Sequence, residues 1–402
     1  MRSLVRARNM AVAATAVGAL LAATAAPALA TNDKYFDQQW NLTQIGAVDA
    51  WSHSTGKGVL IGVVDTGIDA SHPDLAGKID AMADCVGGTC KEGSAPDVQG
   101  HGTAVAGIAA ANANNGVGIA GVAPDAHLVV AKALGDHGGG DTEDINKAIE
   151  WVVDHGARVV NLSLGDPDLQ LVARLGTPLR PGIEYAWSRG AIPVLAAGNY
   201  EGPSGIGSAN YGDLDAVVVG ATDKQGGVAG YSTALGNAKW GVVAPGGNGD
   251  GPGADVLSPM PGNRYAWLAG TSMATPHVSA VLAMLLAEGL SPSAAVNRLL
   301  ATLDHSTSCG IGCQGRVNAS AAVAGGGPAA GTPGTTAAVA APPAEKHPIN
   351  AGLAGLALLL AAAAAVATLR VWSRLQWQDD QTPLSATTGP TGSADRPVAS
   401  AA

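Results

Sequence analysis

Short apolar runs alternate with helix-like segments between about residues 59 and 244, and this alternation restricts the fold more than any other feature of the sequence. The runs are rich in Val, Leu, Ile and Ala without regular polar alternation, as in strands that are buried on both faces. Such strands interleaved with helices predict a three-layer α/β/α fold with a central parallel sheet. The expected strands are 59–64, 127–131, 158–162, 191–196, 216–219 and 241–244, and the expected helices are 102–111, 142–154 and 182–189.

Composition excludes some classes of partner. The chain has 402 residues, 47% of them hydrophobic, with 22 basic and 32 acidic side chains and a formal charge of -10. An acidic surface repels polyanions, so we expect no nucleic-acid binding. The apolar content is sufficient for a large folded core.

The N-terminal segment has the pattern of a secretory signal peptide, which we assign to residues 1–30. Arg2, Arg6 and Arg8 precede an uncharged stretch over 10–26, and Ala28-Leu29-Ala30 forms a small-x-small cleavage site. An uncleaved membrane anchor is the alternative. We expect the mature chain to begin near Thr31.

The C-terminal part predicts a tether and a membrane anchor. After the peptidase-sized region 31–324, residues 325–348 are a Gly-, Pro- and Ala-rich linker that cannot form a core. Residues 349–369 contain no charge and are long enough to cross a bilayer as a transmembrane helix. Arg370 and Arg374 follow, which predicts a cytoplasmic tail over 370–402. A buried apolar helix is the alternative for 349–369.

The four cysteines form two close pairs, Cys85 with Cys90 and Cys309 with Cys313. Export would permit disulfides, and pairing within each couple closes the shortest loops. Three connectivities are possible, and a zinc site with four thiolates is a further alternative.

Three motifs place polar residues at the ends of expected elements. Asp65 follows the first strand in VVDTGID, His101 opens a helix in GHGTAVAG, and Ser272 lies at a helix N-terminus in GTSMATPHV. Taken singly, each has an ordinary explanation as a helix cap or a structural residue. Together they are the side chains of a Ser-His-Asp nucleophilic site in the order Asp, His, Ser.

These motifs, with NLSLG, AAGN and DTGIDASHPDLAGK, resemble the subtilase family over roughly residues 32–324, and they are especially similar to its thermitase-like members. The resemblance implies a subtilisin-like fold and serine endopeptidase activity. Ser272 then corresponds to the nucleophile, His101 to the general base, Asp65 to the residue that orients it, and Asn199 to the side-chain donor of the oxyanion hole.

The resemblance also implies binding sites. Ser163, Leu164 and Gly165 correspond to an edge that pairs with extended substrate, and the Ala197-Gly198 backbone corresponds to a wall of the specificity pocket. A structural calcium site is implied as well; a polar loop satisfied by water is the alternative. Its implied ligands are the side chains of Asp33, Asp74 and Asn115 and the carbonyls of Asn112, Val117 and Ile119.

The sequence departs from the family pattern at three places. Ala104 replaces a second His after GHGT, which has no required step in the mechanism, and GIGSANYG replaces the usual Tyr-Pro loop near the pocket. Only about 35 residues separate Ala30 from Asp65, too few for an inhibitory propeptide. We therefore expect that activation needs no self-cleavage.

The sequence as a whole predicts a secreted, membrane-anchored serine endopeptidase with a monomeric catalytic domain that acts on extracellular polypeptides. An esterase would carry its Ser before the acid and the His, in a Gly-x-Ser-x-Gly turn, which does not fit Ser272. A non-catalytic, membrane-anchored binding module on the same scaffold is a second alternative. The anchor also resembles the architecture of mycosins, which would make the protein a dedicated processing protease.

Overall fold

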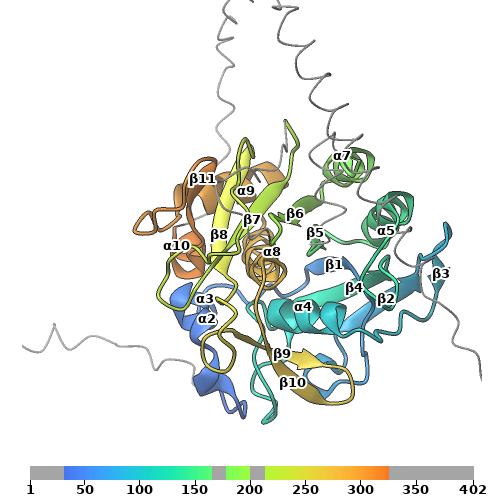
Figure 1. Cartoon of the computed structure of the whole chain (residues 1–402), viewed down its shortest axis with the longest axis horizontal. Coiled ribbons are helices and arrows are strands. Elements are labelled where there is room, and N and C mark those ends of the chain that lie inside the picture. Colours follow the sequence, from blue (N-terminus) through green and yellow to red (C-terminus); the bar gives the residue numbers. More distant parts are fainter. Residues whose placement is uncertain (1–30, 165–177, 200–212, 326–402) are drawn as a thin grey trace, which may run out of the picture. The chain divides into compact units, whose positions relative to one another are not determined.

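β1 (Leu60–Asp65) lies inside a nine-stranded sheet and pairs in parallel with β4 (His127–Lys132) on one side and β5 (Val159–Leu162) on the other (Figure 1). The structure is a computed structural model that describes residues 31–164, 178–199 and 213–325. Because the chain passes from β1 to β4 on one side and later to β5 on the other, the strand order changes direction at β1. Open α/β sheets bind ligands at this kind of position, beyond the carboxyl ends of the strands.

The other strands extend the sheet in both directions, in the order β11-β8-β7-β6-β5-β1-β4-β2-β3. All neighbours are parallel except β2 and β3, which form an antiparallel edge. A separate antiparallel ribbon pairs β9 (Val256–Met260) with β10 (Arg264–Leu268). The remaining strands are β2 (Ile79–Asp84), β3 (Lys91–Glu92), β6 (Ile192–Ala196), β7 (Val217–Thr222), β8 (Trp240–Pro245) and β11 (Cys313–Arg316).

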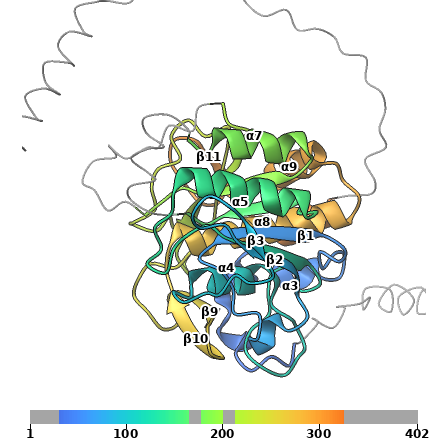
Figure 2. The same ribbon diagram turned by 90° about the vertical axis from the view of Figure 1, so that its right-hand side faces the viewer.

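Helices cover both faces of the sheet, as the alternation of apolar runs predicts (Figure 2). Successive residues of a strand point to opposite faces, and accordingly Val63 and Val130 belong to one core cluster while Val64 and Val129 belong to the other. The first cluster contains α4 (His101–Ala110) and α8 (Thr271–Ala287), and the second contains α5 (Thr142–Asp154) and α7 (Arg180–Ser188). The predicted three-layer arrangement of helices and parallel strands is therefore confirmed.

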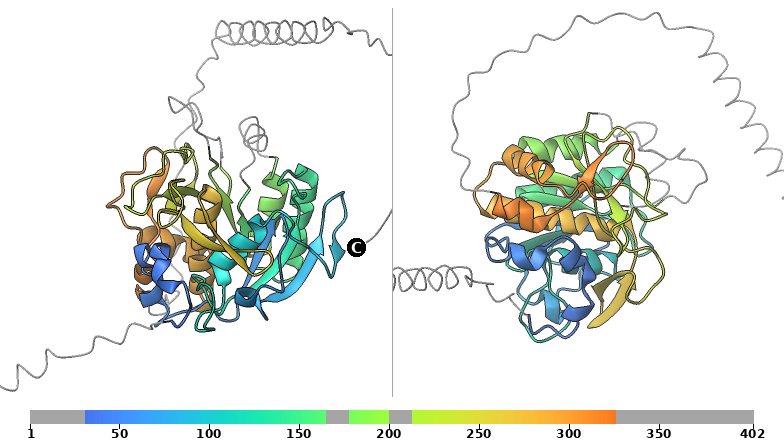
Figure 3. Two further views of the ribbon diagram at one scale, coloured as in Figure 1. Left: turned by 60° about the horizontal axis from the view of Figure 1, so that its bottom comes forward. Right: turned by 90° about the vertical axis from the view of Figure 1, so that its left-hand side faces the viewer.

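Several shorter helices pack into the same core cluster as α4 and α8. Side-chain caps begin α9 (Pro292–Ala301), where Ser291 accepts from the Ala294 N–H, and α10 (Ala319–Ala324), where Asn318 accepts from the Ala321 N–H. The N-terminal elements are η1 (Phe36–Gln38), α2 (Trp40–Gln44) and α3 (Ala47–Ala50), and η2 (Pro73–Leu75) follows β1. The N-terminal helices lie beside α10 (Figure 3), where the Ala319 N–H donates to the Ile45 carbonyl at 2.7 Å.

The sequence located the buried elements well and missed the exposed ones. The predicted helix 142–154 matches α5, and the predicted strand 59–64 differs from β1 by one residue at each end. β2 and β10 were not predicted, because their partly exposed residues lack the continuous apolar run that marks a strand buried on both faces. β9 is largely buried, but Ser258 and Pro259 interrupt its apolar run, so it was not predicted either.

Both short disulfides are present in the structure. Cys85 is bonded to Cys90 and Cys309 to Cys313, so no cysteine remains free to bind zinc. In the loop closed by the first disulfide, the N–H groups of Gly87 and Gly88 donate to the buried Asp144 carboxylate at 2.8 and 2.7 Å. The disulfide and the carboxylate together fix this loop against α5.

The predicted signal peptide, linker, transmembrane helix and cytoplasmic tail lie outside the described residues. Within the described ranges, no single helix is sufficiently long and apolar to cross a bilayer. Only the pair α8 and α9 meets the length and composition required, and the two helices are bent by 120° relative to each other.

Packing of α4 against the β9–β10 ribbon leads to a stability prediction. A Cβ on Gly107 would lie 2.1 Å from Cγ of Pro259, whose ring is part of β9. We expect Gly107→Ala to lower the free energy of unfolding by about 1–2 kcal/mol, because overpacking outweighs the gain in helix propensity. Thermal or urea unfolding measures the effect. Gly230→Ala, where a Cβ meets nothing within 4 Å, is the control, and a Gly107→Ala variant as stable as wild type would contradict the packing argument.

Candidate active site

Asp65 and His101 meet at the carboxyl end of β1. The last residue of β1 is the fully buried Asp65, and His101 is the first residue of α4. The His101 Nδ1–H donates to Oδ1 of Asp65 at 2.7 Å, and the same oxygen accepts from the Thr66 N–H at 2.8 Å. With Nδ1 committed to the carboxylate, Nε2 is the ring atom that is left to accept a proton.

The electrostatic environment favours the protonated form of His101. Burial by itself would lower the pKa of the imidazole, but the nearby Asp65 carboxylate, which is also its hydrogen-bond acceptor, and the more distant Asp97 outweigh this effect and raise the pKa above the usual value. The histidine side chain nevertheless remains 23% exposed. It is therefore both accessible and more basic than an ordinary histidine.

Ser272 lies in the first turn of α8, where a proline changes the hydrogen bonding. Pro276 has no N–H to donate to the carbonyl of Ser272 four residues before it. The Ser163 hydroxyl donates to this carbonyl instead, at 2.9 Å, and the Ser272 hydroxyl donates in return to the Ser163 carbonyl at 3.2 Å. These two bonds fix the start of α8 to the end of β5.

A buried polar network supports this contact from the side of the sheet. The Asn161 amide donates to Oγ of Ser163 at 2.9 Å and accepts from the Ser279 hydroxyl at 2.9 Å. Asn161 lies on β5 and Ser279 lies two turns along α8 from Ser272. Neither residue was predicted to belong to the site, because a polar side chain in a buried strand or helix has no distinctive signal until its partner is known.

Asn199 caps α8 and presents its amide nitrogen. Its Oδ1 accepts from the N–H and the hydroxyl of Thr271 at 2.8 and 3.0 Å, so the nitrogen Nδ2 is the end of the amide that remains to donate. Gly270 precedes the helix with φ at 156°, and a Cβ there would lie 3.3 Å from Nδ2. Glycine at 270 thus keeps the space beside Asn199 and Ser272 open.

These groups lie at one edge of the sheet. Asp65 and Ser163 end or follow the neighbouring strands β1 and β5, Ser272 contacts Ser163, and Asn199 contacts the first residue of α8. Among the described residues, Ser272 donates to Ser163 and makes no hydrogen bond to His101. Rotation of the Ser272 side chain about its Cα–Cβ bond would release the hydroxyl from Ser163.

Four of the five residues expected to bind substrate are described, and they lie at the same edge. Ser163 and Leu164 are buried after β5, and Gly165 lies outside the described residues. The Gly198 N–H donates to Oγ1 of Thr271 at 3.0 Å, and φ of Gly198 is 96°, a value that favours glycine. Ala197 donates to Val219 on β7 at 2.9 Å. The Ala197-Gly198 backbone is therefore fixed between the sheet and α8.

The residues expected to bind calcium gather around one loop. The Asp33 carboxylate accepts from the backbone N–H groups of Asn114 and Asn115, both at 3.0 Å. Asp74 is fully buried and accepts from the Asn115 side chain at 3.1 Å and from the Ile119 N–H at 3.0 Å. Both carboxylates thus accept hydrogen bonds from this loop.

The remaining residues of this loop differ in their contacts. The Asn112 N–H donates to the carbonyl of Asp74 at 2.8 Å, and the Val117 N–H donates to Oδ1 of Asn115 at 3.0 Å. Asn115 turns its amide nitrogen, not its oxygen, toward Asp74. Tyr265, which was not predicted to contact this loop, donates to Asp74 at 2.9 Å.

The donor set fits a hard cation such as calcium. A Cβ on Gly118 would lie 1.9 Å from Oδ2 of Asp74 and 2.0 Å from the Tyr265 hydroxyl, so glycine at this position lets both side chains approach the loop. Oxygen ligands from carboxylates, an amide and carbonyls are those that calcium prefers. The described residues contain no group of three or more His, Cys, Asp or Glu side chains that could hold a metal, so amide and carbonyl oxygens would have to complete the site.

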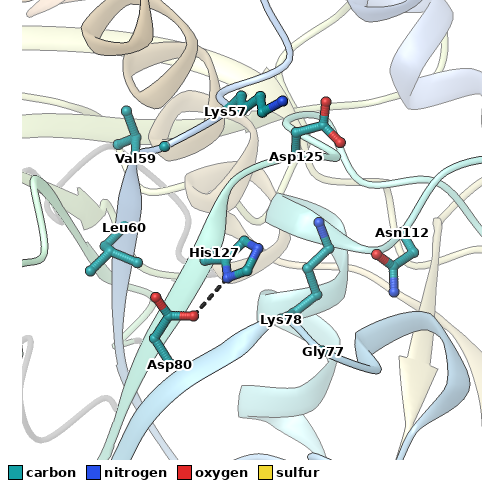
Figure 4. Close-up of a pocket in the computed structure, with 10 residues that line it drawn as sticks. Lys57, Val59, Leu60, Gly77, Lys78, Asp80, Asn112, Asp125 and His127 are labelled. Carbon is teal, nitrogen blue, oxygen red and sulfur yellow. Dashed lines mark hydrogen bonds and ion pairs between the residues drawn. The ribbon is translucent and has the colours of Figure 1, made fainter.

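A cavity of about 640 Å³ lies at the opposite, amino-terminal edge of β1 and β4 (Figure 4). Several of its polar side chains have partners within the fold: His127 with Asp80 at 2.6 Å, Asp125 with Thr55 at 2.7 Å, and Lys78 with the carbonyls of Pro124 and Ala126. Burial lowers the pKa of Lys78. None of the residues expected to be catalytic lines this cavity.

Comparison with known proteins agrees with this geometry. Residues 56–331 match the profile of the subtilase family. Thermitase from Thermoactinomyces vulgaris is 37% identical over 296 residues, which are 73% of this chain and 98% of that protein. A thermophilic serine proteinase from a Bacillus species is 40% identical over 261 residues, 64% of this chain and 60% of that protein.

Further similarities extend to a subtilisin and to a solved structure. Subtilisin Savinase from Lederbergia lenta is 41% identical over 249 residues, 61% of this chain and 83% of that protein. A solved protease structure from Pseudoalteromonas arctica has a TM-score of 0.62 and 31% identity, and the match covers 73% of this chain and 99% of that one. The expected similarity to thermitase-like proteins is confirmed. The chain belongs to the subtilase family and is a serine endopeptidase with a subtilisin-like α/β fold.

Proposed function

We propose that Asp65, His101 and Ser272 are the catalytic triad of this endopeptidase and that Asn199 completes its oxyanion hole. The observation that carries the proposal is the 2.7 Å hydrogen bond from His101 to the buried Asp65, at the sheet edge to which α8 brings Ser272. The bond fixes the tautomer in which Nε2 can accept a proton. The placement of Asn199 beside the start of α8 supplies a donor for the developing oxyanion.

The reaction follows from these roles. Nε2 of His101 takes the proton of the Ser272 hydroxyl while Oγ attacks the carbonyl carbon of the peptide bond. Nδ2 of Asn199 and the backbone N–H of Ser272 stabilise the resulting oxyanion, because both donors are held in place before the charge develops. His101 then gives its proton to the leaving amine, and water hydrolyses the acyl-enzyme by the reverse sequence of proton transfers.

We also propose that the enzyme is exported and anchored, with its catalytic domain outside the cell. The support is the pattern of residues 1–30, the linker 325–348 and the uncharged segment 349–369 before Arg370. Extended polypeptides are the substrate class that suits a backbone-pairing edge. A dedicated processing role, like that of mycosins, is the second candidate, and the anchor favours it because a tether restricts the enzyme to clients at the cell surface.

Calcium binding is a further part of the proposal. The carboxylates of Asp33 and Asp74, the amide of Asn115 and the carbonyls of Asn112, Val117 and Ile119 would hold the ion. Asp33 precedes η1 and Asp74 belongs to η2, so an ion shared by both would crosslink distant segments and stabilise the folded state without taking part in catalysis.

The triad proposal predicts the kinetics of three variants. Ser272→Ala or His101→Ala alone removes nearly all turnover of a peptide substrate, and combining them adds little, because proton transfer and attack form one unit. Asn199→Ala lowers kcat roughly 100- to 1,000-fold with a small change in KM. Asn318→Ala removes a helix cap far from the site and serves as the control, with reduced stability and normal kcat. Near-normal turnover in Ser272→Ala refutes the triad, whereas a wild-type protein without any turnover favours a non-catalytic binding module.

The calcium proposal predicts a metal-dependent melting temperature. An ion that binds only the folded state adds about 3 kcal/mol of stability when it is present at 100 times its dissociation constant. Chelation therefore lowers the Tm of wild type and leaves the Tm of Asp74→Ala unchanged, as measured by calorimetry in the inactive Ser272→Ala background. Asp144→Asn, which alters another buried carboxylate, retains the calcium response. A chelator that leaves wild type unchanged would refute the site.

The topology proposal predicts the behaviour of a truncated protein. Termination after Ala324 releases a soluble protease with full activity, because all the proposed catalytic groups precede this residue and the linker after it has the composition of a tether. Cell fractionation and a peptide assay measure this. N-terminal sequencing finds the same start near Thr31 in wild type and in Ser272→Ala, since signal peptidase makes that end. A truncated protein that stays with the membrane, or different N-termini in the two proteins, would count against the proposal.

A further inference from the structure

Asp97 is a buried carboxylate four residues before His101, and its two oxygens accept four hydrogen bonds. Oδ1 accepts from the Thr66 hydroxyl at 2.8 Å and from the Gly100 N–H at 2.7 Å. Oδ2 accepts from the N–H and the hydroxyl of Thr103 at 2.8 and 2.6 Å. The side chain is 8% exposed, so these bonds replace water around a negative charge.

The acceptors and donors of this cluster belong to the two segments that carry Asp65 and His101. Thr66 follows Asp65 directly, and its hydroxyl accepts from the Gly102 N–H at 2.9 Å while it donates to Asp97. Gly100 and Thr103 flank His101 at the start of α4, where Gly100 provides no side-chain cap. Asp97 takes the place of that cap and connects the beginning of α4 to the turn after β1.

Close packing at this contact shows that the connection has little freedom. A Cβ on Gly102 would lie 2.2 Å from the carbonyl oxygen of Gly67, and a Cβ on Gly67 would lie 2.5 Å from the carbonyl oxygen of Ala95. On β4, the Lys132 ammonium also donates to the Thr66 carbonyl, at 2.8 Å. The two backbone segments are therefore in direct contact, and the Asp97 carboxylate is the polar group that links them by hydrogen bonds.

We propose that Asp97 is a positioning residue of the peptidase: by joining Thr66 to the first turn of α4, its carboxylate holds His101 in the orientation in which Nδ1 meets Asp65. This inference rests on the proposed triad and adds a residue outside it. Small errors in the placement of a general base reduce the rate strongly, because proton transfer requires hydrogen-bond distance and alignment.

The charge of Asp97 has a second effect, on the pH dependence of activity. The charged groups around His101 are Asp65 on β1, Asp97 before α4 and Lys132 on β4. The Asp69 carboxylate instead accepts hydrogen bonds from Ser71 and from the Gly262 N–H. β5 and α8 contribute the neutral residues Ser163 and Ser272. Asp97 is one of the two carboxylates that raise the pKa of His101, and removal of its charge lowers that pKa. Since only neutral His101 acts as a base, the acid limb of activity moves to lower pH.

The test compares wild type with Asp97→Asn in the full-length protein, with active sites counted by a fluorophosphonate. Asparagine keeps the size of the side chain but cannot accept all four bonds. We expect kcat for a peptide substrate to fall about 10- to 100-fold, KM to change less than about threefold, and the acid limb of kcat/KM to move to lower pH. Asp144→Asn is the matched control: it alters a buried carboxylate that also accepts loop N–H groups and leaves both kcat and the pH profile unchanged.

A second pair of variants tests the connection without a change of charge. Thr66→Val removes the hydroxyl that joins Asp97 to the turn, and Thr66→Ser retains it. We expect Thr66→Val to lower kcat, Thr66→Ser to remain close to wild type, and the double variant Thr66→Val with Asp97→Asn to be no slower than Asp97→Asn alone, because both act on one connection. This pair decides the question if Asp97→Asn does not fold.

Three results would overturn the proposal: a kcat per titrated site in Asp97→Asn equal to wild type, a change confined to KM or to thermal stability, or equal kcat values in Thr66→Val and Thr66→Ser. A wild-type protein that neither hydrolyses peptides nor reacts with the fluorophosphonate would instead refute the triad.

Discussion

β1 pairs in parallel with both β4 and β5, and the position of the candidate site follows from this arrangement. Because the strand order changes direction at β1, the helices that follow are placed on both faces and the carboxyl ends of β1 and β5 are left side by side. Asp65 ends the first of these strands, and Ser163 follows the second. His101 and Ser272, in the first turns of α4 and α8, therefore lie at the same edge of the sheet.

Each reactive side chain at this edge is fixed by a group from a different segment of the chain. Pro276 leaves a carbonyl without a helical donor, and Ser163 supplies the donor from β5. Asn199 caps α8 with its oxygen, which orients its nitrogen toward the open space beside Gly270. Departures from ideal helix geometry are thus compensated by long-range hydrogen bonds, and the same bonds set the geometry of the site.

The proposed calcium loop and the polar cavity lie in parts of the fold other than the sheet edge that carries the candidate active site. The loop that is proposed to bind calcium involves the residues before η1 and the segment around η2, while the polar cavity lies at the amino-terminal edge of the sheet, away from the carboxyl ends of the strands. In the cavity, Lys78, His127 and Asp125 are paired within the fold. The carboxyl edge differs, because the groups that we propose to meet a substrate, Nε2 of His101 and Nδ2 of Asn199, lie there.

The order and type of most buried elements could be predicted from the sequence, because continuous apolar runs and helical periodicity are local properties. It also indicated Asp65, His101, Ser272 and Asn199, which stand at element ends in recognisable motifs. Only the tertiary structure revealed the roles of Asp97, Asn161 and Tyr265, and only it placed the β9–β10 ribbon. The physical reason is that a hydrogen bond depends on distances of a few tenths of an ångström between segments far apart in the chain, and no local pattern in the sequence encodes that distance.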